Sequence, residues 1–338
     1  GWSNNSVTVS LSATDTASGV AATYYQLDTS PVAQGTRLTI DTEGVHSLQV
    51  WSVDNAGNVE AQQNVEVKID KTAPLISHAL SPLPNAAQWN HSDVTVTFTC
   101  TDAVSGVASC TSPVTKGEGA AQKVDGTAVD NAGNQATDEA TVNVDETKPT
   151  VTGSLSAPPN AHGWFNSPVT ATFTCADQAG LSGVASCPAD ATLGQGQGQS
   201  AGGTATDAAG NVSDPFTLSG INVDTTAPTL GGATTTAPNA NGWYNGDVTV
   251  KWSAADNLSG LDGSVPANST VTGEGQNLSA SASVSDLAGN TTNATVGGIQ
   301  IDRTSPVTTA TAPTDWQSST VTVTLKATDN LSGVAGTY

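Results

Sequence analysis

The sequence predicts an all-β chain built as a tandem array of small β-sandwiches. The first observation is a motif, Asp-x-Ala-Gly-Asn, which begins at Asp54, Asp130, Asp207 and Asp286, with gaps of 76, 77 and 79 residues. A motif that recurs at so even a spacing indicates equal modules rather than one large domain. The second is that apolar and polar residues alternate in short runs, without helical periodicity. The third is composition: 338 residues with 4% aromatics and no Met suit several thin cores better than one deep core.

Module boundaries follow from a second motif, the linker Asp-x-Thr-x-Pro. It occupies residues 70–74, 145–149, 224–228 and 302–306. Proline cannot continue a central ladder, so each linker marks the end of one sandwich and the start of the next. We therefore expect modules at 1–72, 73–147, 148–226 and 227–304, and a partial module at 305–338. Five residues leave little slack, so we expect neighbouring modules to be stiffly coupled.

The first module is expected to lack its first strand and to be a longer subtype. Asp15 and Asp54 lie 39 residues apart, whereas the equivalent pairs in later modules lie 28 to 30 apart. Residues 328–338 match residues 14–24, so the last segment starts another module. We expect the chain to be a window of a longer array, truncated at both ends.

A tryptophan follows each Pro- and Asn-containing loop near the start of a module. Five of the seven Trp each precede a recurring Asp by 13 residues. These are Trp2, Trp89, Trp164, Trp243 and Trp316. We interpret them as caps that close the sandwich edge rather than as sugar-stacking platforms, because a small core needs a buried aromatic side chain.

The clearest strand of each module comes next. Apolar residues alternate with Thr, Ser or Lys over residues 7–13, 94–100, 169–175, 248–254 and 321–327, which is typical of a half-buried antiparallel strand. A Ser-Gly turn follows each run. A later alternating strand, such as Leu278 to Val284, leads into the Asp-x-Ala-Gly-Asn motif, and a closing strand such as Ile299 to Ile301 ends the module.

The motif itself is predicted to be a tight hairpin turn, because Gly and Asn tolerate positive φ. Its turn residues are Asp54, Gly57, Asn58, Gly133, Asn134, Gly210, Asn211, Gly289 and Asn290. A separate glycine-rich run at residues 194–198 lacks the Lys and helix of a phosphate-binding loop, so we interpret it as a flexible hairpin.

Short strands at this spacing, in modules of about 75 to 79 residues, favour immunoglobulin-like (Ig-like) sandwiches. The segments SATDTASGV, FTCTDAVSGVASC, VDNAGN and IDKTAP resemble the tandem Ig-like repeats of bacterial surface and secreted proteins. The resemblance covers the whole chain. It implies a stalk, spacer or adhesive array.

The four cysteines form two local pairs, Cys100 with Cys110 and Cys175 with Cys187. The first member of each pair has the inward phase of its strand, and the second lies just past the Ser-Gly turn. A disulfide there would join the two sheets and indicates an oxidising compartment. Two thiols without a Cys or His partner at ligand spacing argue against a metal site of their own.

Three carboxylates are predicted to converge where one module meets the next. One Asp comes from the linker, one from the end of the clearest strand, and one from the Asp-x-Ala-Gly-Asn motif. The sets are Asp70, Asp102, Asp130; Asp145, Asp177, Asp207; Asp224, Asp256, Asp286; and Asp302 with Asp329. Hard oxygen ligands of this kind suit Ca²⁺. The alternative is that each Asp accepts hydrogen bonds from its own turn, as Asp15 could from Ser18 and Gly19.

Charge and motifs exclude several function classes. The chain carries 30 acidic and 9 basic residues and a formal net charge of -21, which argues against nucleic acid and anionic membrane surfaces as partners. No apolar run approaches the length of a membrane span. The four His occupy unrelated positions without a nucleophile and acid beside them, so no catalytic residues are predicted.

The prediction is therefore a non-catalytic extracellular or cell-surface array that forms a stalk, fibre or filament. Its partners would be neighbouring modules or copies of the same protein, and a free sheet edge could pair with another chain. One alternative is an adhesin that binds glycan or protein through its pole loops, with Tyr24 and Tyr25 as the candidate segment. Another is an accessory array beside a secreted enzyme.

Overall fold

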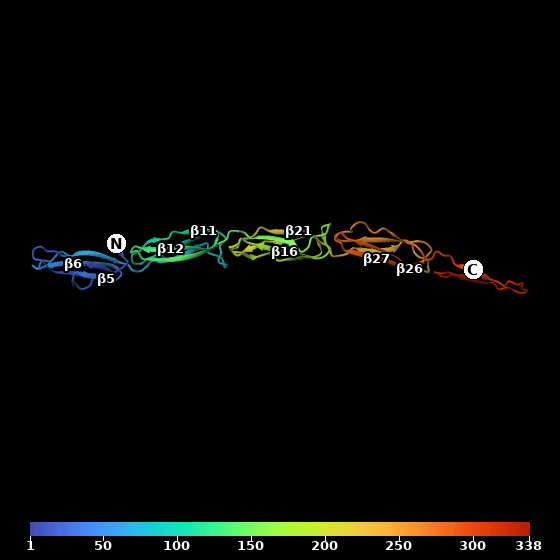
Figure 1. Cartoon of the computed structure of the whole chain (residues 1–338), viewed down its shortest axis with the longest axis horizontal. Coiled ribbons are helices and arrows are strands. Elements are labelled where there is room, and N and C mark those ends of the chain that lie inside the picture. Colours follow the sequence, from blue (N-terminus) through green and yellow to red (C-terminus); the bar gives the residue numbers. More distant parts are fainter. The chain divides into compact units, whose positions relative to one another are not determined.

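The computed structural model describes all 338 residues, and they form strands, turns and loops without a helix (Figure 1). None of its elements is a helix long and apolar enough to cross a membrane. The chain divides into two compact units, and the division runs through the third expected module. The first unit comprises residues 1–151, 175–187 and 204–214, and the second comprises residues 152–174, 188–203 and 215–338.

In the first unit, residues 1–72 form a two-stranded and a five-stranded sheet. The smaller pairs β2 (Val7–Ser10) with β5 (Arg37–Ile40). The larger has the order β1-β7-β6-β3-β4. Its strands are β1 (Trp2–Ser3), β7 (Gln63–Ile69), β6 (Gly44–Asp54), β3 (Val20–Leu27) and β4 (Ala33–Gln34). The long β3 and the added edge strand β4 account for the extra residues between Asp15 and Asp54.

Residues 73–147 show the repeating topology most plainly. One sheet has the order β11-β9-β8 and the other β10-β12-β13. The strands are β8 (Leu75–Ser81), β9 (Val94–Thr101), β10 (Val107–Cys110), β11 (Val114–Lys116), β12 (Gly119–Asp130) and β13 (Gln135–Val144). In Ig nomenclature these are strands A, B and E against C, F and G, which is the Ig-like arrangement. The first module repeats it with strands B and E against a sheet that contains C, F and G.

The core between these two sheets comes from the inward phase of the alternating strands. Val94, Val96 and Phe98 of β9 pack against Val124 of β12 and Val142 of β13. The Thr residues of β9 face outward. The alternation in the sequence therefore predicted correctly which side chains of this strand face the core and which face solvent. The structure contains the disulfides Cys100–Cys110 and Cys175–Cys187. The first joins β9 of one sheet to β10 of the other.

The third expected module contributes strands to both units. The first unit includes β17 (Val184–Ser186) paired with β20 (Thr206–Asp207). The second unit contains the sheet β15-β21-β19 and most of the sheet β14-β16-β18. These strands are β14 (Thr150–Leu155), β15 (Trp164–Phe165), β16 (Val169–Ala176), β18 (Ala191–Leu193), β19 (Gly196–Gly203) and β21 (Phe216–Val223).

Residues 227–304, in the second unit, repeat the arrangement. The sheets are β22-β24-β25 and β23-β27-β26. Their strands are β22 (Thr229–Thr234), β23 (Trp243–Tyr244), β24 (Val248–Ala255), β25 (Ser269–Val271), β26 (Gly275–Ser285) and β27 (Thr291–Ile301). The core contains Val248, Val250, Trp252, Ile299 and Ile301.

Residues 305–338 depart from the sequence prediction. They form one two-stranded sheet, β28 (Val307–Thr311) with β29 (Thr324–Thr328). The strand expected from residue 321 begins at Thr324, and Val321 and Val323 are exposed. Trp316 is also fully exposed and caps nothing. The physical reason is that these residues supply no second sheet for the apolar face to pack against.

The other tryptophans of the recurring set lie closer to the cores. Trp164 is buried, and Trp2, Trp89 and Trp243 are half-buried. The glycine-rich run at 194–198 is not a hairpin. Residues 194–195 connect β18 of one sheet to β19 of the other, and the Gln195 side chain holds the next linker, as described below.

Glycines make room for the large core aromatics. A Cβ atom added to Gly126 would lie 2.3 Å from the Phe98 ring, and one added to Gly232 would lie 2.4 Å from the Trp252 ring. A module with few aromatics can therefore bury a large ring only where the opposing strand presents a hydrogen atom instead of a side chain. By contrast, nothing lies within 4 Å of the Cβ position of Gly194.

This packing yields a stability prediction. Gly126→Ala should lower the free energy of unfolding by about 1–3 kcal/mol, because the buried Phe98 ring must move. Gly194→Ala is the matched control and should change it little. Urea denaturation of both variants measures the difference, and equal stability of the two would contradict this account of the core.

A second prediction concerns pH. The His46 ring is buried in the first module, with Nδ1 2.8 Å from Asp28 Oδ2 and Nε2 2.9 Å from the Thr42 carbonyl oxygen. The Thr42 hydroxyl also lies 3.2 Å from Nε2, so this nitrogen can donate to the carbonyl oxygen when the ring is protonated or accept from the hydroxyl when the ring is neutral. The hydrogen bond to Asp28 raises the pKa of His46, although burial opposes the shift.

A raised folded-state pKa means that the stability His46 contributes is fully present below its unfolded pKa of about 6.5. That stability is lost as the pH rises through the folded-state pKa. The melting temperature of the first module should therefore fall as the pH rises above about 6.5 and through the raised folded-state pKa of His46. His46→Gln should flatten this dependence, and an unchanged pH profile in that variant would refute the assignment.

Candidate functional site

The recurring polar feature of the structure is a buried acidic cluster at each linker, which we call a joint. Joint 1 contains Asp70, Asp102 and Asp130; joint 2 contains Asp145, Asp177 and Asp207; joint 3 contains Asp224, Asp256 and Asp286. Within each joint, one oxygen from each carboxylate lies within 4.8 Å of the others. Joint 4 contains Asp302 and Asp329. Joints 1 and 2 lie in the first compact unit, and joints 3 and 4 in the second.

The linker Asp of each joint is the most deeply buried member. Asp70, Asp145 and Asp224 are each 0% exposed, and Asp302 is 8% exposed. Two segments fix the position of this residue. The first is the closing strand of its own module, which each linker Asp directly follows. The second is the strand or loop that carries the recurring tryptophan, which accepts a hydrogen bond from the backbone N–H of the linker Asp, as the Asn90 carbonyl does from Asp145 at 2.9 Å. The side chain is thereby aimed at the following module.

The linker carboxylate spans two modules through its two oxygens. In joint 2, Asp145 Oδ1 accepts from the Thr147 N–H at 3.0 Å within the linker, and Oδ2 accepts from the Ser182 N–H at 3.0 Å in the next module's Ser-Gly turn. The same pair of bonds recurs in every joint. The linker N–H donors are Thr72, Thr147, Thr226 and Thr304, and the Ser-Gly donors are Ser105, Ser182, Ser259 and Ser332.

The Asp-x-Ala-Gly-Asn motif supplies the second contact between modules. Asp207 Oδ1 accepts from the N–H groups of Gly210 and Asn211, and its Oδ2 accepts from Asn211 Nδ2 at 2.8 Å. The same Nδ2 donates to the Asp145 carbonyl oxygen at 2.7 Å. The last Asn of the motif therefore ties its own turn to the preceding linker. Asn134 and Asn290 make the equivalent bonds to Asp70 and Asp224.

The third Asp of each joint stabilises the Ser-Gly turn with one oxygen only. Asp102 Oδ1 accepts from the N–H groups of Val104 and Gly106, and Asp256 Oδ2 accepts from those of Leu258 and Gly260. In Asp177, Oδ2 accepts from the Gly183 N–H, whereas Oδ1 is buried without a hydrogen-bond partner. The structure thus contains both the Asp-stabilised turns and the convergence of the three carboxylates.

Hydrogen bonds lower the pKa of Asp130 and of Asp224 despite their burial. Burial raises the pKa of Asp130, but donors from Asn134, Gly133 and Ala132 outweigh it and lower the pKa overall. Burial likewise raises the pKa of Asp224, and donors of Ser259, Thr226 and Gln195 lower it further than burial raises it. Stability linked to a lowered Asp pKa is present above the unfolded value of about 3.9 and is lost as the pH falls through the folded value.

Two sets of residues that sequence reasoning missed complete the joints. A Glu or Gln before the F strand holds the linker from the side: Glu43 accepts from Lys71 N at 2.7 Å, and Gln195 donates to Asp224 Oδ1 at 3.0 Å. Glu118 and Glu274 take the same position. Their recurrence directly before Gly44, Gly119, Gly196 and Gly275 was the available signal.

The second missed set lies in the Pro- and Asn-containing loop. Asn85 Oδ1 accepts from the N–H groups of Ala87 and Trp89, which leaves Nδ2 free to donate to the Ala208 carbonyl oxygen of the next module at 2.8 Å. Asn160 makes the equivalent bond to the Leu287 carbonyl oxygen at 2.8 Å. Joints 2 and 3 are therefore each held at two places, once at the linker and once at this loop.

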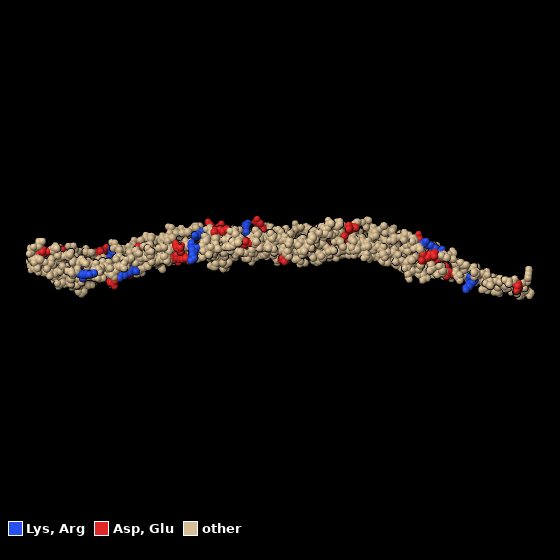
Figure 2. All heavy atoms as spheres, viewed as in Figure 1, with Lys and Arg blue, Asp and Glu red and all other residues tan.

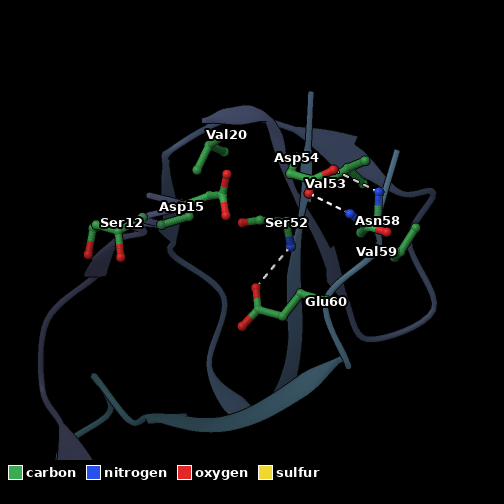
Figure 3. A pocket seen from close by; sticks show the side chains of 11 residues that line it. Ser12, Asp15, Val20, Ser52, Val53, Asp54, Asn58, Val59 and Glu60 are labelled. Atoms are coloured by element: carbon green, nitrogen blue, oxygen red, sulfur yellow. Dashed lines mark hydrogen bonds between the residues drawn. The ribbon is translucent and has the colours of Figure 1, made fainter. Parts of the chain in front are cut away.

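The first module has two of the three Asp residues. Asp15 accepts from Ser18 and Gly19, and Asp54 accepts from Ala56 and Asn58. Asp15 and Asp54 line an open pocket of about 470 Å³ together with Asn58 and Glu60. Figure 3 shows these side chains around the pocket. Lys and Arg side chains are few and do not gather into a basic patch on the face that Figure 2 draws.

Comparisons with known proteins give structural likeness only. No family model matches the chain, and no curated protein sequence matches it. A solved tetra-tandem repeat from the extending region of a large adhesion protein aligns at 17% identity and a TM-score of 0.28, over 89% of this chain and 97% of that one. Fibronectin(III)-like modules of Clostridium thermocellum CbhA align at 10% identity and a TM-score of 0.21, over 66% and 87%.

A third similar structure is described as concerning host cell surface retention of a 1.5-MDa bacterial ice-binding adhesin. It aligns at 12% identity and a TM-score of 0.26, over 65% of this chain and 91% of that chain. At such scores the alignments carry no argument about activity.

The buried linker carboxylate yields a third prediction. Asp145→Ala removes the acceptor of the Thr147 and Ser182 N–H groups and should lower the free energy of unfolding of the third module by about 1–3 kcal/mol. Glu146→Ala is the matched control, because Glu146 is the neighbouring acidic residue and is exposed. Thermal unfolding of both variants tests this, and equal losses would show that the linker carboxylate contributes nothing specific.

Proposed function

We propose that this chain is part of an extracellular, non-catalytic array that holds its modules in a fixed relation and so sets distance or transmits load. The observation that carries the proposal is that every linker Asp is buried in the joint and bonded to the following module's Ser-Gly turn. A flexible tether would leave its polar groups in water. Here both oxygens of the linker carboxylate are committed, one to each side of the joint.

Three further features support the proposal. The contacts across joints 1 to 3 come from the repeated motifs themselves, so the same coupling recurs wherever a complete module follows a linker. The disulfides join the two sheets of the second module and clamp the equivalent end of the third, and such bonds persist in oxidising compartments. A net charge of -21 keeps such a chain soluble and disfavours nucleic acid.

Distance measurements between spin labels test this function. The structure has no free cysteine, so Asp125→Cys on the second module and Val212→Cys on the third, both exposed and both in the first compact unit, provide a pair of labelling sites across joint 2. The parent chain should give one narrow distance distribution. Adding Asp145→Ala and Asn211→Ala should broaden it, whereas Glu146→Ala should leave it narrow. A broad distribution in the parent chain would overturn the proposal.

A second candidate function is adhesion through the first module. Tyr25 packs into the core, so the alternation of β3 turns Tyr24 to the opposite face, where its ring stacks on Trp51 with centroids 6.0 Å apart. Both rings are half-buried. A glycan array probed with the intact chain and with a Tyr24→Ala, Trp51→Ala variant tests this, and equal binding by both would exclude the aromatic pair. An accessory role beside an enzyme depends on sequence outside this chain.

A further inference from the structure

The joints contain the only unpartnered polar side-chain atoms buried in this chain. There are four: Ser105 Oγ in joint 1, Asp177 Oδ1 in joint 2, Ser259 Oγ in joint 3 and Asp329 Oδ1 in joint 4. A buried oxygen without a partner is costly, and native structures keep few of them. Finding one in each joint, and none elsewhere, indicates that the joints are built around something besides their own hydrogen bonds.

Ser259 is the most deeply buried of the four residues, at 7% exposed. Its backbone N–H donates to Asp224 Oδ2 at 3.0 Å, which places the residue against the linker carboxylate of joint 3. Its hydroxyl contributes to the lowered pKa of Asp224 but makes no hydrogen bond of normal geometry to any group. In joint 2 the equivalent hydroxyl, that of Ser182, donates to Asp145. There the unpartnered atom is a carboxylate oxygen of Asp177 instead.

The charge of each joint is also uncompensated. The chain's ion pairs use other acids, such as Asp41 with Lys71 and Asp247 with Arg303, and none includes a carboxylate of joints 1 to 4. Three carboxylates within 4.8 Å repel one another strongly in a buried setting. The backbone donors reduce this repulsion but supply no full positive charge.

We infer that each of joints 1 to 3 binds one calcium ion. Calcium takes six to eight oxygen ligands at about 2.3–2.6 Å, so two of its ligands can lie up to about 5 Å apart. The carboxylate oxygens of each joint lie within 4.8 Å of one another, which satisfies this limit. The unpartnered oxygen of Asp177 is a further acceptor in joint 2, as the Ser259 hydroxyl is in joint 3, and water would complete the shell.

Calcium would act on the coupling itself. One carboxylate comes from the linker and two come from the following module, so an ion that holds all three joins the modules more tightly than hydrogen bonds alone. This inference rests on the proposed function, but the two are tested separately. The distance distributions are measured with a chelator present, so they report the stiffness of the array without metal. Stiff modules that bind no calcium, and flexible modules that do bind it, would therefore be told apart.

Calorimetric titration of the EDTA-treated, dialysed chain with CaCl₂ is the test. Binding in the range of extracellular modules, with Kd about 10⁻⁴–10⁻³ M or tighter, is expected. Asp177→Asn keeps an oxygen for the Gly183 N–H but replaces the unpartnered one with an amide. It should reduce the number of bound ions by one, as should Asp256→Asn in joint 3. Asp125→Asn, at an exposed position on β12, should retain the full number.

Melting temperature gives an independent readout. Calcium should raise the Tm of the parent chain by several degrees, through preferential binding to the folded state. The rise should be smaller in the two Asn variants, whose circular dichroism in EDTA should match that of the parent. Magnesium at the same concentration should give a weaker effect. Absence of saturable calcium binding up to about 10 mM, well above that Kd range, would overturn the inference, as would unchanged stoichiometry in both Asn variants.

Discussion

The structure depends on a carboxylate that belongs to one module and is buried in the joint with the next. A buried acid is tolerated only when its oxygens are satisfied, and each linker Asp meets this condition by accepting from its own linker and from the following Ser-Gly turn. Its environment exists only when both modules are folded. The coupling between neighbours is therefore a property of the fold, since the donors are backbone N–H groups that the turns fix in place.

Each joint is assembled from segments that are distant in sequence but are brought together by the Ig-like topology. The B and F strands end at the same pole, which places the Ser-Gly turn beside the Asp-x-Ala-Gly-Asn turn. The linker arrives there directly from the closing strand. The linker-proximal end of the third module, residues 175–187 and 204–214, belongs to the same compact unit as the second module.

Most of the fold could be predicted from the sequence because its signals are local. Alternation over residues 94–100 set the inward face of β9, and proline and glycine marked the turns. The convergence of Asp70, Asp102 and Asp130 followed from strand phase and topology together. The sequence could not show that Asn85 donates to a carbonyl of the next module or that Gln195 holds the Asp224 linker, because both bonds depend on relative placement. Trp316 was misjudged because local pattern does not reveal whether a second sheet is present.

Amide hydrogen exchange at the Ser-Gly turns tests the central claim most directly. The N–H groups of Ser105, Ser182 and Ser259 each lie in a short turn, where amide exchange is ordinarily fast. If the linker carboxylates are docked as described, these three amides should be protected to a degree comparable with the neighbouring strands. Exchange at the rate of exposed loops would contradict the account, since it would mean that the linkers are not held by the modules they join.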